Sequence, residues 1–327
     1  MPPGYHRPTV SLPLKPPIDP QLARSGKELP LGEQWCYEPK FDGFRAIAFV
    51  DGDELWLQSR GAKPLHRYFP ELSFPPGRYV LDGEIVIDDD SDPSHATQDF
   101  GALQQRIHPA ESRIAMLSEQ IPARYVAFDL LALDDDVLLS LELAERREAL
   151  ERLATLGISL TPSTADPAGT AGWLRDGEGV VAKDLRAPYR PGERKGMVKV
   201  KRVRTIDAVV AGYRPGKEAG TVGSLILGLY DDDGELHVVG HSSGLRAGEK
   251  RALVQRLKPY ETGERGSADP SRWQSDRELE WIALRPELVV EVTFDHASGG
   301  RIRHGTRILR WRDDKAPGEC RLEQMRL

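Results

Sequence analysis

A lysine near the start of the chain has neighbours that could let it act as a nucleophile. Residues 38–45 read Glu-Pro-Lys-Phe-Asp-Gly-Phe-Arg and stand just before a strand-like apolar run. An amine attacks phosphorus or a carbonyl carbon only in its neutral form, and an unperturbed lysine has a pKa of about 10.4. Cationic neighbours, burial or a metal must therefore help Lys40 to lose its proton. Lys40 thus predicts a second set of charged residues elsewhere in the chain.

The pattern Lys-x-Asp-Gly is weak on its own. With each fixed residue at roughly 5 to 7% usage, about one chain in twenty of this length contains it by accident. The alternative interpretation of Asp42 and Gly43 is a turn, because Asp-Gly between apolar residues is common turn chemistry. A lysine beside such a turn is usually a solvated surface group. The order of the motifs that follow is what favours a site.

Two later segments supply the expected charges. Residues 178–183 read Glu-Gly-Val-Val-Ala-Lys, which places Glu178 at the head of a short apolar strand and Lys183 at its far end. Alternate residues of a strand share a face, so Lys199 and Lys201 should project together from the next strand. Two ammonium groups on one face repel each other unless an anion lies between them. The alternative is a sheet edge that lysines protect from pairing.

Apolar runs indicate the elements that must position these residues, and they predict an α+β first domain. Residues 44–50 and 55–58 are joined by Asp-Gly-Asp-Glu, a strong hairpin signal, so Lys40 stands where a sheet begins. Further strands are expected at residues 78–87, 124–133, 179–183 and 197–202, with helices near 98–106 and 141–154. Later strand-like runs at 208–212, 224–229, 236–241 and 288–294, with one helix at 247–257, suit a small five-stranded barrel.

The ordered motifs resemble those of the covalent nucleotidyltransferases, which include ATP-dependent DNA ligases, RNA ligases and mRNA capping enzymes. The resemblance rests on residues 40–45, 59–61 (Ser-Arg-Gly), 82–84 (Asp-Gly-Glu), 128–131 (Phe-Asp-Leu-Leu), 178–183 and 199–201. Residues 307–315 resemble the last ligase motif, Arg-x-Asp-Lys, read from Arg312 with one residue inserted or from Arg310 to Lys315. The resemblance covers nearly the whole chain. Its motifs are most similar to those of small stand-alone bacterial DNA ligases of the ligase C type.

This resemblance implies a nucleotidyltransferase (ATP-grasp-like) adenylation domain over residues 1–203, followed by an all-β OB-fold barrel over residues 204–327. A division is also expected because 327 residues exceed the size at which one core stops growing. The catalytic residue would be Lys40, which attacks the α-phosphate of ATP, releases pyrophosphate and leaves a lysyl-AMP. The resemblance further implies ATP and a divalent metal, Mg²⁺ or Mn²⁺, as cofactors.

The other motif residues receive roles from the same resemblance. Lys199 and Lys201 would stabilise charge on the α-phosphate, and Glu84 would bind ribose. The expected ligands of ATP or AMP are Glu38, Arg45, Arg60, Glu84, Phe128, Lys183, Lys199, Lys201, Arg310, Arg312 and Lys315. The expected metal ligands are Glu178, Glu84 and Asp42.

Several of these residues have plain structural alternatives. Phe128 would stack on adenine, but a phenylalanine inside an apolar strand is more often part of the core. Arg45 and Arg60 would contact ribose and phosphate, yet either could instead pair with Asp42 or Asp82. The resemblance places the C-terminal cluster of Arg310, Arg312 and Lys315 on the β- and γ-phosphates.

Composition sets further bounds. The net charge is −6, but bases outnumber acids eleven to four between residues 183 and 218, which is typical of a surface that binds a polyanion. The alternative is a solvated basic loop. Cys36 and Cys320 are too few for a four-cysteine zinc site. The NAD-dependent DNA ligases, which resemble this family in their chemistry, carry a zinc module, so the resemblance favours ATP over NAD as cofactor. The sequence has neither a membrane-span pattern nor a signal-peptide pattern, so we expect a cytoplasmic protein.

The leading hypothesis is an ATP-dependent DNA ligase that seals nicks in duplex DNA in DNA repair. We expect it to act as a monomer and to have no membrane partner. The resemblance suggests a separate repair primase-polymerase as a partner. An RNA ligase or a guanylyltransferase would use the same lysine. A non-catalytic nucleic-acid-binding OB protein is the alternative from another class, and the joint presence of the charged motif residues disfavours it.

Overall fold

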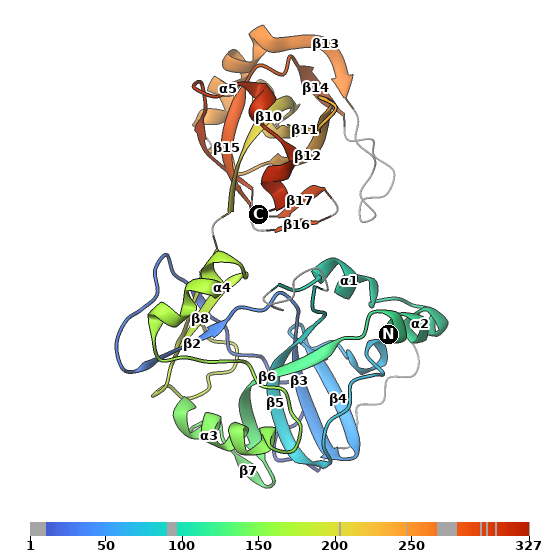
Figure 1. Cartoon of the computed structure of the whole chain (residues 1–327), viewed down its shortest axis with the longest axis vertical. Coiled ribbons are helices and arrows are strands. Elements are labelled where there is room, and N and C mark those ends of the chain that lie inside the picture. Colours follow the sequence, from blue (N-terminus) through green and yellow to red (C-terminus); the bar gives the residue numbers. More distant parts are fainter. Residues whose placement is uncertain are drawn as a thin grey trace. The chain divides into compact units, whose positions relative to one another are not determined.

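The chain divides into two compact units, Met1–Arg202 and Val203–Leu327, each of which we describe by itself (Figure 1). The structure is a computed structural model. It describes residues 11–89, 97–202, 204–246, 248–266, 280–294, 296–298, 300–304 and 306–326.

The first unit contains a five-stranded antiparallel sheet. Its strands in spatial order are β4 (Glu54–Ser59), β3 (Phe44–Gly52), β5 (Gly77–Val86), β6 (Arg124–Leu133) and β7 (Asp136–Val137). The expected hairpin is confirmed, because Asp51 pairs with Glu54. Successive residues of β3 point to opposite faces of the sheet. Ala46, Ala48 and Val50 pack in one buried cluster, and Ile47 and Phe49 pack in another, which explains the continuous apolar run. Both faces of this sheet are therefore covered.

Helices cover one face of this sheet, and the N-terminal segment covers the other. Residues of α1 (Phe100–Gln105) and α3 (Leu143–Ala154) belong to the first cluster, and α2 (Glu111–Gln120) follows α1. Leu12, Ile18 and Tyr189 pack in the second cluster. The helices expected near residues 98–106 and 141–154 are confirmed, whereas α2 was not expected.

A second sheet of four strands completes the first unit. In spatial order it contains β1 (Arg24–Ser25), β9 (Met197–Lys201), β8 (Gly179–Asp184) and β2 (Trp35–Pro39), with the short helix α4 (Ala171–Arg175) nearby in sequence. Tyr37, Val180, Ala182, Val198 and Val200 form its buried cluster. The chain passes from β2 of this sheet to β3 of the other through residues 40–43, so Lys40 lies at the connection between the sheets.

The second unit is built on one curved seven-stranded antiparallel sheet. The long strand β10 (Arg204–Pro215) pairs with three neighbours, β11 (Val222–Tyr230), β14 (Trp281–Leu284) and β15 (Val289–Phe294). The remaining strands are β12 (Leu236–Ser242), β13 (Glu261–Gly266) and β18 (Arg307–Trp311), with a separate hairpin of β16 (His296–Ser298) and β17 (Arg301–His304). Helix α5 (Glu249–Leu257) packs into the same core, and residue 247 of the expected helix lies outside the described residues.

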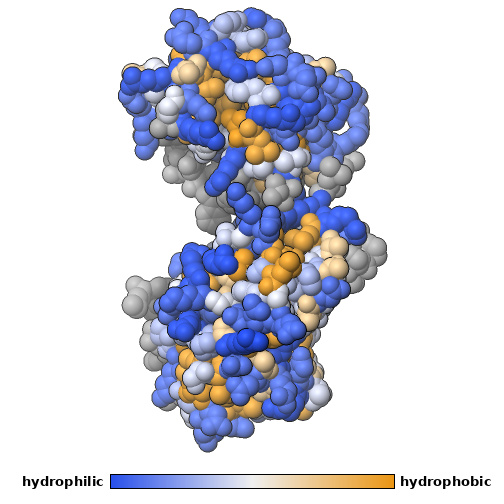
Figure 2. All heavy atoms as spheres, turned by 90° about the vertical axis from the view of Figure 1, so that its left-hand side faces the viewer, coloured by the Kyte–Doolittle hydropathy of each residue, from blue (hydrophilic) through white to orange (hydrophobic). Residues whose placement is uncertain are grey.

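An α+β first unit followed by a second unit built on a β-sheet agrees with the expected fold class, a nucleotidyltransferase domain followed by an OB-fold. The main sheet of the second unit has seven strands where five were expected, because β13, β14 and β18 are short and lack long apolar runs. Figure 2 shows mostly hydrophilic surface in the view that it presents, with separate hydrophobic patches. Among the described residues, no helix has the length and apolar character needed to cross a membrane.

Candidate active site

A pocket in the first unit is lined by residues from both of its sheets. Leu22 and Ala23 of the N-terminal segment add to its wall, as do Arg194 and Met197. Most of the site residues predicted for this unit line the pocket. They are Glu38, Lys40, Asp42, Arg45, Arg60, Glu84, Phe128, Lys183 and Lys199.

Lys40 is fixed in the pocket by its backbone. Its N–H donates to the carbonyl of Gly179 at 2.9 Å, which continues the pairing of β2 with β8. Its side chain is partly buried, and Nζ donates to the carbonyl of Phe41 at 3.3 Å. The lysine that the sequence singled out is thus held at the end of a strand rather than on a solvated loop.

Glycine in the Asp42-Gly43 pair serves close packing rather than a tight turn. Gly43 does not adopt a positive φ, and a Cβ there would lie 2.3 Å from the carbonyl oxygen of Ile85 and 2.8 Å from Cγ of Glu84. Any side chain would push β5 away. Gly43 therefore allows Glu84 to approach the lysine segment.

Cations gather around the lysine, as the sequence predicted. Lys199 lines the pocket from β9, between the buried Val198 and Val200, so the expected alternation is right. Burial lowers the pKa of Lys199, and the charges of Lys201, Lys40, Arg194 and Arg60 lower it further. Lys201 is exposed at the end of β9 and is not part of the lining. Such mutual repulsion is relieved when an anion binds between the groups.

Carboxylates stand on the same pocket. Asp42 and Glu84 line it, and burial raises the pKa of Glu84 to about 7, with Asp82 and Asp42 adding to the rise while Arg45 and Lys40 oppose it. Carboxylate oxygens are ligands that Mg²⁺ and similar hard cations prefer, so this donor set fits a divalent metal. Glu178, the third predicted metal ligand, precedes β8 and does not line the pocket.

The raised pKa of Glu84 predicts a pH-dependent stability. A carboxyl group whose folded pKa lies above its unfolded value favours folding at low pH, and that contribution is lost as pH rises from about 4.5 to about 7. Glu84→Gln should therefore gain melting temperature relative to the parent chain across this window and hold the gain above it. Thermal unfolding at pH 5 and pH 8, with Glu111→Gln on the exposed surface as control, measures the difference. An equal change at both pH values would contradict it.

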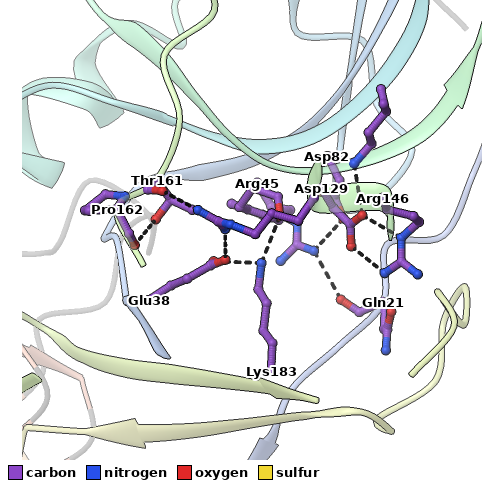
Figure 3. A network of polar contacts seen from close by, with 12 residues as sticks. Gln21, Glu38, Arg45, Asp82, Asp129, Arg146, Thr161, Pro162 and Lys183 are labelled. Atoms are coloured by element: carbon purple, nitrogen blue, oxygen red, sulfur yellow. Dashed lines mark hydrogen bonds and ion pairs between the residues drawn. The ribbon is translucent and has the colours of Figure 1, made fainter. Parts of the chain in front are cut away.

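The carboxylate of Glu38 forms ion pairs with two cationic side chains in the wall of the pocket (Figure 3). Its carboxylate lies 2.7 Å from Nζ of Lys183 and 2.6 Å from Nη1 of Arg147, and it is only 3% exposed. Burial raises the pKa of Glu38, and the two cations oppose that rise. Lys183 also donates to the carbonyl of Phe128 at 3.1 Å, so the triad connects β2, β8, β6 and α3.

Phe128 is not a core residue. Its ring is partly buried and lines the pocket, with the guanidinium carbon of Arg45 and Nζ of Lys183 each 4.4 Å from the ring centre. Cations over an aromatic face are attracted by its quadrupole. The neighbouring Asp129 points elsewhere and pairs with Arg146 of α3 in a buried ion pair at 2.8 Å.

Arg45 pairs with Asp82, which was one of the two partners that the sequence analysis offered. Its Nε and Nη2 donate to the two carboxylate oxygens of Asp82, both at 2.6 Å, and Asp82 is fully buried (Figure 3). Two parallel bonds of this kind fix the guanidinium plane. Arg45 therefore reaches the pocket in one defined orientation, while the exposed Arg60 lines the pocket after β4.

The predicted C-terminal cluster lies in the second unit. Arg312 and Lys315 both contact Asp207 of β10, at 2.9 Å and 3.2 Å, and Arg310 pairs with Glu291 at 2.6 Å. The cluster therefore has carboxylate partners within its own unit.

Sequence reasoning missed several residues of the site. Leu22 and Ala23 carry no chemical signal, and Arg147 is one of many charged residues on a surface helix. Tyr189 lies in the basic segment but was not singled out. Only Arg194 could have been found, because it belongs to the run of bases after residue 183.

Comparison with known proteins agrees with this geometry. The family model described as ATP dependent DNA ligase domain matches residues 20–201, and the one described as ATP dependent DNA ligase C terminal region matches residues 218–315. DNA ligase C1 of Mycolicibacterium smegmatis is 44% identical over 97% of this chain and 96% of its own length. DNA ligase C of Mycobacterium tuberculosis is 42% identical with the same coverage.

Solved structures extend the comparison. The ligase domain of LigD from M. tuberculosis is 29% identical, covers 93% of this chain and 97% of its own, and has a TM-score of 0.52. A mycobacterial DNA ligase D, in a structure described as complexed with ATP and MES, is 30% identical with the same coverage and TM-score. The membership that the motifs indicated is thereby confirmed: this chain belongs to the family of ATP-dependent DNA ligases.

Proposed function

We propose that this chain seals nicks in duplex DNA through a lysyl-AMP formed on Lys40. The observation that carries the proposal is the joint presence of Lys40, Lys199, Arg60 and Arg194 on one pocket. A cationic pocket suits the phosphates of ATP and of the adenylated intermediate. As a member of its family, the chain uses ATP, nicked DNA and a divalent metal ion.

Each residue of the pocket has a task that its position supports. Lys40 attacks the α-phosphate, pyrophosphate leaves, and Lys199 stabilises the charge on the phosphate, to which Lys201 would add from outside the lining. Arg45, held by Asp82, and Arg60 contact ribose and phosphate. Asp42 and Glu84 would hold the metal ion, which we propose to be Mg²⁺, with Glu178 approaching when substrate binds. A bound divalent cation neutralises charge that develops on the phosphate oxygens.

The base of ATP would lie against Phe128. The ring lines the pocket, and Glu38 and Lys183 stand beside it. Stacking on an aromatic face and hydrogen bonding to buried polar groups together select a base. The AMP then passes from Lys40 to the 5′-phosphate of the nick, and the neighbouring 3′-hydroxyl displaces AMP to join the strands.

Labelled nucleotides test this function. The protein is incubated with Mg²⁺ and α-labelled ATP or GTP, and then with a nicked duplex whose broken strand is DNA or RNA. Acid-stable label from ATP and joining of the DNA strand are expected. Label from GTP alone would favour a guanylyltransferase. Joining of the RNA strand alone would favour an RNA ligase, and absence of label from both nucleotides would favour a non-catalytic binding protein.

Residues 1–203 would carry the adenylation site, and residues 204–327 would supply Arg310, Arg312 and Lys315 to the β- and γ-phosphates. Arg312→Ala should then slow adenylation by ATP by roughly 10²-fold, the scale for loss of one stabilising donor. Joining of a nick that already carries 5′-AMP should change far less, because no β- or γ-phosphate is present. Rapid-quench measurement of both steps, with Arg321→Ala as control, checks this. Equal losses in the two steps would contradict the assignment.

A repair role, a separate primase-polymerase as partner and a monomeric state complete the proposal. DNA ligase C1 and DNA ligase C are chains of similar length to this one, whereas another relative is named a multifunctional non-homologous end joining protein, LigD. In this proposal a separate primase-polymerase fills gaps before this chain seals the strand. Co-purification from cells with damaged DNA and analytical ultracentrifugation test these points.

A further inference from the structure

A closed ring of buried hydrogen bonds stands behind Arg45. The hydroxyl of Tyr189 donates to Oδ2 of Asp82 at 2.6 Å and accepts the backbone N–H of Gln21 at 3.0 Å. Nη2 of Arg45 donates to the same Oδ2 at 2.6 Å and to the carbonyl of Gln21 at 3.2 Å. The ring thus returns to Gln21 through both polar groups of its backbone. Figure 3 shows Gln21, Arg45 and Asp82 together at this point.

The members of this ring come from segments far apart in the sequence. Arg45 lies on β3, Asp82 on β5, Tyr189 on the connection between β8 and β9, and Gln21 on the segment before β1. Asp82 is fully buried, Gln21 is 3% exposed and Tyr189 is 4% exposed. Water therefore cannot readily replace a lost partner, and each group depends on the others.

The ring also fixes part of the pocket wall. Leu22 and Ala23, which line the pocket, follow directly after Gln21. The side chain of Gln21 donates to the carbonyl of Lys195 at 2.5 Å and accepts from the N–H of Arg190 at 3.2 Å. The N–H of Leu22 donates to the carbonyl of Glu193 at 2.8 Å. These hydrogen bonds therefore tie residues 20–23 to the connection at 189–195.

We propose that Tyr189 is a positioning residue for nucleotide binding. It does not line the pocket. Its hydroxyl orients Asp82, which orients the guanidinium of Arg45, and it holds the backbone that carries Leu22 and Ala23. The inference rests on the proposed function only in taking ATP as the ligand of the pocket.

Tyr189→Phe tests the inference, because it removes one hydroxyl and keeps the ring. Loss of a hydrogen bond to a charged group in a buried network should weaken binding about tenfold. We expect the KM for ATP in adenylation to rise by that factor while kcat changes less than about twofold. Calorimetric titration with α,β-methylene-ATP, which cannot transfer AMP, should show the same loss of affinity.

Tyr79→Phe is a matched control. Tyr79 is 1% exposed, its hydroxyl donates to the carbonyl of Pro75, and it does not line the pocket. Both variants should lose melting temperature, but only Tyr189→Phe should lose nucleotide affinity. If the two variants have the same nucleotide affinity, the inference is overturned, whatever their melting temperatures. A parent chain that takes no label from ATP would instead overturn the proposed function.

An Arg45→Lys background tests the route of the effect. If Tyr189 acts through the guanidinium, Tyr189→Phe should raise KM less in this background than in the parent chain, since coupled residues are not additive. Full additivity of the two changes would overturn the link through Arg45. If Tyr189→Phe lowers expression, Gln21→Ala removes the side-chain bonds to residues 190 and 195 and should raise KM in the same direction. An unchanged KM there would count against the positioning role.

Discussion

Lys40→Ala should abolish the covalent enzyme–AMP adduct. Loss of a nucleophile that acts with its neighbours as a unit costs roughly 10⁴-fold or more in rate, and no other lysine on the pocket is placed at the end of β2. Lys199 lines the same pocket from β9, where we propose that it stabilises the phosphate rather than attacks it. The measurement is acid-stable label from α-labelled ATP, followed by peptide mapping of the labelled residue.

A substrate that already carries AMP separates loss of the nucleophile from loss of the fold. The variant should still join a nick with a preformed 5′-adenylate, because that step needs the pocket but no amine. Lys15→Ala, on an exposed side chain outside the pocket, should behave like the parent chain in both steps. Label on the Lys40→Ala chain, or its failure to join the adenylated nick while its circular dichroism is unchanged, would show that Lys40 has another role.

Local patterns predicted much of the fold and of the site. Strand alternation placed Lys199 beside buried valines, and the Asp-Gly-Asp-Glu turn joined β3 to β4 as expected. These features depend on neighbours within a few residues, so the sequence shows them directly. The order of the charged motifs, together with the resemblance, led to the residues that line the pocket.

The pairing of Arg45 with Asp82 was named from the sequence as an alternative, but other pairings across the fold were not predicted. Arg147 reaches Glu38 over 109 positions, and Tyr189 reaches Asp82 over 107. One member of each pair lies on an element whose local sequence indicates only a helix or a loop. The packing role of Gly43 was not predicted for the same reason, since the obstruction comes from Ile85 on the neighbouring strand. Such contacts follow from which strands become neighbours, and no local pattern encodes that choice.

The buried triad around Glu38 carries the second large prediction. Glu38→Ala leaves Lys183, 4% exposed, and Arg147, 11% exposed, without their shared carboxylate. Removal of one partner from a buried ion pair typically costs about 3 to 5 kcal/mol, because the remaining charge is uncompensated. The free energy of unfolding of the first unit should fall by about that amount. Hydrogen exchange of the β2 and β8 amides in the full chain, followed by mass spectrometry, reports this unit separately.

A compensating variant separates the structural role of the triad from its role in the pocket. Glu38→Leu combined with Lys183→Met removes both buried charges, while Arg147 keeps Glu151 and the carbonyl of Thr161 as acceptors, at 3.2 Å and 3.1 Å. Replacing a buried ion pair by apolar residues of similar volume is often neutral for stability. The double variant should therefore regain most of the lost protection but bind α,β-methylene-ATP poorly, because the polar groups beside Phe128 are gone. Recovery of both properties would mean that Glu38 and Lys183 serve only the fold, and base recognition would then have to come from the backbone of the pocket.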